Sequence, residues 1–184
     1  KLSKIAELQG LRRISIGETL TPDLDKAIPI TNINKVHSGA GLKRSYTGAG
    51  VIVGVTDWGF DFTHEMFSDA SGAPRITRAW ITQDNTGVPP HGYQGGTLYT
   101  NANYLKNMLK CTNNKDNHGT HVLGIVGGRK VAAQKRTYTG VAPAAELIVA
   151  ELYGVTKVSA PSVTLIETVE YMFNCWSVHE NRHT

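Results

Sequence analysis

The fold of this chain is decided by the stretch Val51-Ile-Val-Gly-Val-Thr-Asp57-Trp-Gly-Phe-Asp61. Its apolar first half is rich in β-branched residues, as in strands that are buried on both faces of a parallel sheet. Asp57 follows this run directly, where the strand meets a glycine-containing turn. Because open α/β sheets bind ligands at the carboxyl ends of their strands, Asp57 is a candidate site residue.

A second stretch predicts a short helix that starts at a histidine: Asp116-Asn-His118-Gly-Thr-His121-Val-Leu-Gly-Ile-Val-Gly-Gly128. The apolar residues after His118 have helical spacing, and the two final glycines are a typical helix stop. The glycines nearer the start allow another backbone to approach closely. His118 is therefore a second candidate site residue.

Further elements follow in an order that indicates the fold class. The turn Gly140-Val-Ala-Pro143 precedes a second buried strand over 147–152, and an amphipathic helix follows Pro161. Strand, helix, strand and helix in succession indicate an α/β sheet with parallel crossovers. The region 75–117 is rich in Gly, Asn, Thr and Pro and predicts hairpins and surface loops. We expect core packing for the stripe of the last helix, formed by Leu165, Ile166, Val169, Met172, Phe173 and Trp176.

The composition excludes several classes of protein. The chain has 184 residues, 40% of them hydrophobic and 18% charged, which is typical of a packed globular domain. No apolar stretch approaches the about 20 residues that a membrane span needs. The net charge of +4 is dispersed, so we expect no nucleic-acid binding. Cys111 and Cys175 fit neither a redox motif nor a zinc motif and leave their disulfide state open.

The two quoted segments and the Gly140–Pro143 turn resemble those of the subtilisin-like serine proteases, the subtilases of the peptidase S8 family. In that family a buried strand ends in Asp-x-Gly and a helix opens with His-Gly-Thr-His-Val-x-Gly. The resemblance runs from about Tyr46 to Leu152. It implies a three-layer α/β/α fold with a mostly parallel sheet, here incomplete at the C-terminal end. Residues 46–184 would be the N-terminal portion of the catalytic domain.

The resemblance also implies a reaction. His118 would be the base that deprotonates a serine, and Asp57 would orient His118, so the full-length protein would be a serine endopeptidase. The nucleophile motif Gly-Thr-Ser-Met-Ala is not found here, and none of the late serines Ser159, Ser162 and Ser177 has a glycine neighbour. We expect this chain to be inactive alone. The alternative is a non-catalytic, subtilase-like binding scaffold.

Several other positions near the two motifs either match the family pattern or depart from it. By the resemblance His121 is a packing or hydrogen-bonding residue, and Asp61 and His64 are structural. Trp58 stands where the family usually has a small hydroxyl residue, which leaves the support of Asp57 open. Met66 stands where many relatives supply a carboxylate to a calcium site, and a thioether is a poor calcium ligand. We therefore expect no required cofactor or metal.

Two rival chemistries fit the residues less well. Asp57, His118 and His121 could be three ligands of a metal hydrolase, but no glutamate lies between the histidines as in His-Glu-x-x-His. Gly48-Ala-Gly50 could suggest nucleotide binding, but these glycines precede the strand, whereas the dinucleotide motif follows it.

Residues 1–45 form a lead-in of mixed polarity, and residues 8–16 weakly resemble the last strand of a subtilase prodomain. The chain contains no signal-peptide pattern, and an extracellular or cell-envelope location is implied by the resemblance alone. The expected partners are protein or peptide substrates and the missing C-terminal part of the domain. An exposed apolar edge would also favour a homodimer.

Overall fold

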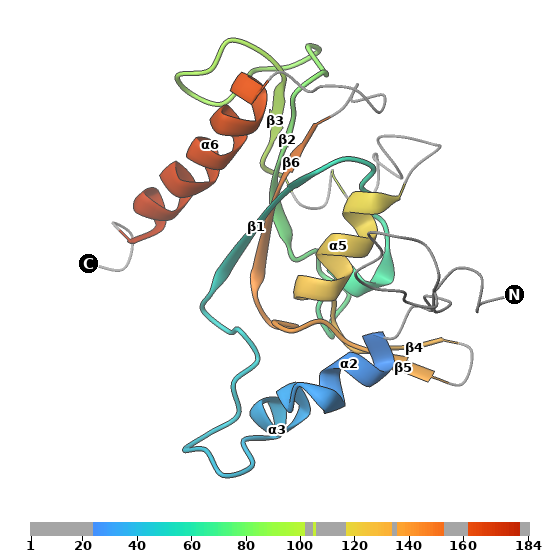
Figure 1. Ribbon diagram of the computed structural model, residues 1–184. Coiled ribbons are helices and arrows are strands. Elements are labelled where there is room, and N and C mark those ends of the chain that lie inside the picture. Colours follow the sequence, from blue (N-terminus) through green and yellow to red (C-terminus); the bar gives the residue numbers. More distant parts are fainter. Residues whose placement is uncertain (1–23, 102–104, 106–116, 134–135, 153–161, 181–184) are drawn as a thin grey trace, which may run out of the picture.

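The computed structural model describes residues 24–101, 105, 117–133, 136–152 and 162–180, and Figure 1 shows their arrangement. The strands are β1 (Ile52–Asp57), β2 (Ile76–Ile81), β3 (Thr97–Tyr99), β4 (Val131–Ala133), β5 (Arg136–Tyr138) and β6 (Glu146–Glu151). The helices are α2 (Leu24–Ile30), α3 (Ile33–Ser38), the 3₁₀ turn η1 (Glu65–Phe67), α5 (His118–Gly127) and α6 (Ser162–Glu180). The predicted strand at 8–16 lies outside the described residues, as does Cys111.

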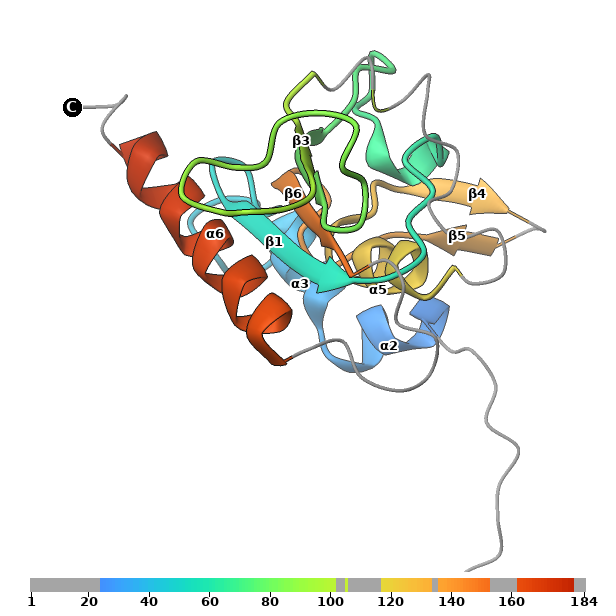
Figure 2. The ribbon, with the colours of Figure 1, turned by 90° about the horizontal axis from the view of Figure 1, so that it is seen from above.

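The main sheet has the strand order β1-β6-β2-β3. Strands β1 and β2 both run parallel to β6, whereas β3 pairs antiparallel with β2. Helix α5 lies on one face of this sheet and α6 on the other, as the two views in Figure 1 and Figure 2 show. The predicted α/β class, with a mostly parallel sheet between helical layers, is therefore confirmed.

Alternation along the strands divides the core into two clusters. On β6, Leu147 and Val149 pack in the cluster that includes Leu123 of α5, and Ile148 packs with Tyr171 of α6. On β1, Val53 and Val55 belong to the α5 side. Since side chains alternate faces along a strand, the next residue in this series, Asp57, also faces α5.

The region 75–117 differs from the prediction in one respect. A hairpin is present, because β2 and β3 pair antiparallel, but β2 is not a surface segment. It also pairs with β6 and is an interior strand, with Ile76, Ala79, Trp80 and Ile81 buried. The neighbouring Gly- and Asn-rich loops obscured this short strand, whose burial comes from its partners on both sides.

Helix α6 also differs from its prediction. Tyr171 and Thr168 are buried against the sheet, whereas Phe173 is 69% exposed and Ile166 65% exposed. Leu165 and Val169 are exposed as well. These four residues of the stripe therefore face outward, because the sheet contacts a different side of the helix. Met172 packs as expected, against the cluster that contains Tyr171, and the side chain of Trp176 lies outside the described part of the chain.

Part of the predicted lead-in is helical and contacts the remainder of the chain. Helices α2 and α3 are separated by Thr31 and Asn32, and Asn32 adopts a left-handed backbone conformation with φ of 60°. Ile28 of α2 is buried, and His37 Nε2 lies 2.8 Å from the carbonyl oxygen of Val141. The boundary at residue 45 remains a prediction.

Arg75 joins the start of β2 to two other segments. Its Nη1 donates to the carbonyl oxygen of Gly127 at the end of α5, over 2.7 Å, and its Nη2 donates to that of Ala145 before β6, also over 2.7 Å. Burial lowers the pKa of the guanidinium, which stays charged because its ordinary pKa is so high. The structure thus uses backbone carbonyls to solvate a partly buried cation.

We predict that Arg75→Met lowers the free energy of unfolding by about 2–4 kcal/mol, because it leaves buried carbonyl groups without donors. Arg44→Met, at an exposed arginine that lies over Tyr46, should cost less than about 1 kcal/mol. Urea titration of both variants measures the difference. Equal midpoints for the two variants would contradict the role of Arg75.

Candidate active site

The structure brings Asp57 and His118 together. Asp57 ends β1 and His118 begins α5, and Asp57 Oδ1 lies 2.7 Å from His118 Nδ1. Asp57 is only 7% exposed, whereas the histidine side chain is 50% exposed. An ionised carboxylate can only accept a hydrogen bond, so Nδ1 carries the hydrogen and Nε2 is the ring nitrogen that can accept a proton.

The backbone around Asp57 holds its carboxylate in place. Asp57 Oδ1 also accepts a hydrogen bond from the amide of Trp58, over 2.7 Å. The carbonyl oxygen of Asp57 accepts one from the amide of Leu152, over 2.7 Å. Backbone amides thus fix both the end of β1 and the side chain that it carries.

A second carboxylate, Glu151, lies beside Asp57 at the end of β6. The two residues are partners in the parallel register, and Glu151 is fully buried. Its Oε1 accepts a hydrogen bond from the amide of Gly59, over 3.0 Å, so it supports the turn that follows Asp57. The sequence analysis did not identify Glu151 as a site residue. It could have been found by the pattern that identified Asp57, an acidic residue near the end of a buried strand.

The start of α5 is bonded to the turn after β1. The amide of Gly119 donates to the carbonyl oxygen of Trp58 over 2.6 Å, and the amide of Thr120 donates to that of Gly59 over 3.1 Å. The Thr120 hydroxyl donates to the same Gly59 oxygen. The first amides of a helix have no partner inside the helix, and here the turn supplies one to each of two. These bonds set the position of His118 relative to Asp57.

Gly119 is needed for this close approach. A Cβ at this position would lie 2.8 Å from the carbonyl oxygen of Trp58 and 2.7 Å from the ring of Phe60. Backbone atoms and a buried ring cannot move aside cheaply. Gly124 in the same helix differs, because a Cβ there would only contact the sulfur of Met66 at 3.7 Å.

Asp61 and His64 bond to other groups, and His121 lines a cavity whose lining does not include this pair. Asp61 Oδ1 accepts hydrogen bonds from the amide and hydroxyl of Thr63, and His64 Nδ1 accepts one from the amide of Met66. His121 is exposed and lines a cavity of about 370 Å³ together with Asp61 and His64. Asp61 and His64 thus bond to the local backbone.

Two observations concern metal binding. Within residues 24–101, 105, 117–133, 136–152 and 162–180, no three His, Cys, Asp or Glu side chains gather as metal ligands would. Met66, at the position associated with calcium in the sequence analysis, packs against the core cluster on the α5 side. Its thioether therefore serves as core packing.

In this pair one histidine nitrogen lies on a buried carboxylate at the carboxyl edge of a parallel sheet, which leaves the other nitrogen able to take a proton. The family model of the subtilase family, Peptidase_S8, matches residues 48–174, and the chain belongs to this family.

Curated relatives agree with this assignment, and a solved structure shares the fold. The chain is 27% identical over 177 residues to the PII-type proteinase of Lactococcus lactis subsp. cremoris, and 26% identical over 175 residues to that of Lacticaseibacillus paracasei. Each match covers 92% of this chain but 9% of the relative, so the chain spans less than a tenth of these proteins. The structure of the Clostridium perfringens CspB protease matches with a TM-score of 0.61 and 21% identity, over 81% of this chain and 31% of that one. This last likeness concerns the fold.

We predict that Gly119→Ala disrupts the contact between Asp57 and His118 and lowers the free energy of unfolding by about 2–4 kcal/mol, because the added methyl group meets the Trp58 carbonyl. Gly124→Ala should be neutral or stabilising by up to about 1 kcal/mol, since it adds helix propensity and its methyl group makes an ordinary van der Waals contact with Met66. Denaturant titration of the pair is the measurement. A Gly119→Ala protein as stable as Gly124→Ala would show that the close approach is not required.

Proposed function

We propose that the full-length protein is a serine endopeptidase of the subtilase type. The observation that carries this proposal is the 2.7 Å contact between buried Asp57 and half-exposed His118, at the carboxyl edge of the sheet. Family membership supports it, as do the relatives described as proteinases. The arrangement leaves Nε2 of His118 to take a proton, as a serine nucleophile requires.

The proposed reaction uses these two residues with a serine supplied by polypeptide outside the 184 residues. His118 Nε2 takes the serine proton as the serine oxygen attacks the peptide carbonyl carbon. Asp57 holds the ring in the required tautomer and stabilises the imidazolium that forms. His118 then gives the proton to the leaving amine, and an acyl-enzyme forms. Water hydrolyses that ester by the same route, with His118 again acting as the base.

On this proposal the 184 residues alone are inactive, because they contribute two of three triad members. An apolar cavity of about 590 Å³ between β1 and α6, lined in part by Gly54, Val169 and Phe173, supports the view that further polypeptide packs there. Exposed apolar surface of this kind is costly when left in water. A second copy of the chain is the other occupant to test, and sedimentation would reveal it as a homodimer.

The proposal extends to substrates, cofactors and location. Protein or peptide chains would be the substrates, and the chemistry needs no metal, since the base and its orienting group are both side chains of this protein. The family resemblance favours an extracellular or cell-envelope location. In the described part of the chain, no helix has the length and apolarity needed to cross a membrane.

A serine-reactive fluorophosphonate tests this function in the full-length protein. We expect labelling and peptide cleavage in the wild type, loss of both in His118→Ala, and a fall of about 10³- to 10⁴-fold in kcat for Asp57→Asn, which leaves His118 in the wrong tautomer. His121→Ala, three residues along the same helix, is the matched control and should keep its activity. A folded wild-type protein that neither labels nor cleaves would instead support a binding scaffold.

A further inference from the structure

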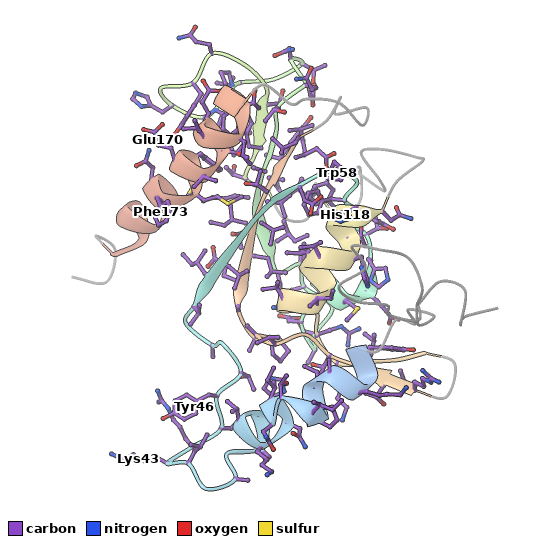
Figure 3. All side chains as sticks on the ribbon, in the orientation of Figure 1. Lys43, Tyr46, Trp58, His118, Glu170 and Phe173 are labelled. Atoms are coloured by element: carbon purple, nitrogen blue, oxygen red, sulfur yellow. The ribbon has the colours of Figure 1, made fainter. Side chains whose placement is uncertain are left out.

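The indole ring of Trp58 lies flat against the imidazole ring of His118. The two ring centroids are 4.7 Å apart and the ring planes differ by 13°, which is a stacked arrangement. Figure 3 shows both side chains at the same end of α5. Trp58 thus covers one face of the proposed base, and the residue before it is the carboxylate that bonds to the edge of the same ring.

The backbone of Trp58 is bonded to Asp57 and to Gly119, the residue that follows His118. Its amide donates to Asp57 Oδ1 over 2.7 Å, and its carbonyl oxygen accepts from the amide of Gly119 over 2.6 Å. These bonds fix the peptide units on both sides of the Trp58 Cα atom. The indole therefore starts from a defined position, and its stack against His118 follows from the same contacts that bring Asp57 and His118 together.

The packing of Trp58 differs from that of a core aromatic residue. Trp80, for comparison, is 2% exposed and lies within the α6-side cluster with Tyr171. Trp58 is only partly buried, and among the described residues it belongs to neither core cluster. Its indole stacks on the ring of His118. Loss of the indole should therefore affect the histidine more than the fold.

We propose that Trp58 is a positioning residue for His118, a role that rests on the proposed peptidase function. The stacked indole restricts rotation of the half-exposed imidazole, so that Nε2 keeps one direction while Nδ1 stays on Asp57. The face of the indole also attracts a positively charged imidazolium more strongly than it attracts a neutral imidazole. Since His118 becomes positive only as it takes the serine proton, this attraction favours the transition state over the resting enzyme.

The experiment compares three variants of the full-length protein: Trp58→Leu, Trp58→Phe and Tyr46→Leu. Tyr46 is the matched control, because it is also a partly exposed aromatic residue but lies at the far end of the molecule from His118 (Figure 3). The kcat and KM values are measured on a peptide amide, with active sites counted by fluorophosphonate. The proton resonances of the His118 ring are recorded by NMR, with His118→Ala for assignment.

We expect Trp58→Leu to lower kcat about 5- to 10-fold with KM changed less than about twofold, in line with the strength of one aromatic contact. Trp58→Phe, which keeps a smaller aromatic face, should recover kcat to within about threefold of the wild type. Tyr46→Leu should match the wild type. The His118 ring protons should move downfield most in Trp58→Leu, less in Trp58→Phe and not in Tyr46→Leu, since the shielding by the stacked indole is lost in the first and reduced in the second.

Other results would overturn the proposal. A Trp58→Leu protein with wild-type kcat, or an equal loss in Trp58→Leu and Trp58→Phe, would refute the positioning role and leave the peptidase function intact. A raised KM with unchanged kcat would also refute it, because Trp58 would then act on substrate binding. A folded wild-type protein without labelling or cleavage would overturn the peptidase function, and this role with it.

Discussion

The hydrogen bonds between the first amides of α5 and the Trp58–Gly59 carbonyls are the constraint on which the site depends. They join a helix start to the turn after β1 at a separation that only a glycine at position 119 permits. Because Asp57 precedes this turn and His118 precedes Gly119, the same bonds determine the distance between carboxylate and imidazole. The geometry of the site thus follows from backbone contacts, which side-chain rotation cannot easily disturb.

The carboxyl edge of the sheet concentrates polar groups that the rest of the core excludes. Asp57 and Glu151 are buried neighbours in register, and burial of a carboxylate costs free energy unless it is hydrogen-bonded. The amides of Trp58 and Gly59 each donate to one of them. The turn after β1 therefore donates a backbone hydrogen bond to each of the two carboxylates. Below this edge, the two strands carry the aliphatic side chains that hold α5 and α6 on opposite faces.

Much of this edge could be predicted from local sequence, and the reason is physical. A buried strand that ends in an acidic residue, and a glycine-rich helix that starts with histidine, are patterns formed by neighbouring residues. The position of Glu151 shows the limit of such patterns. Its strand was predicted, but its support of Gly59 depends on which strand lies beside β1. The stack of Trp58 on His118 depends likewise on two segments that are 60 residues apart along the chain.

The sequence by itself determined the α/β class, the presence and approximate positions of β1, α5 and β6, and the two residues of the pair, because burial periodicity and glycine placement act over a few residues. Only the tertiary structure decided that β2 is an interior strand and that α6 presents Phe173 outward. It also decided that an indole covers the histidine. Each of these features depends on which distant segment of the chain packs against the element concerned. Strand pairing and packing between layers are only weakly encoded in the local sequence.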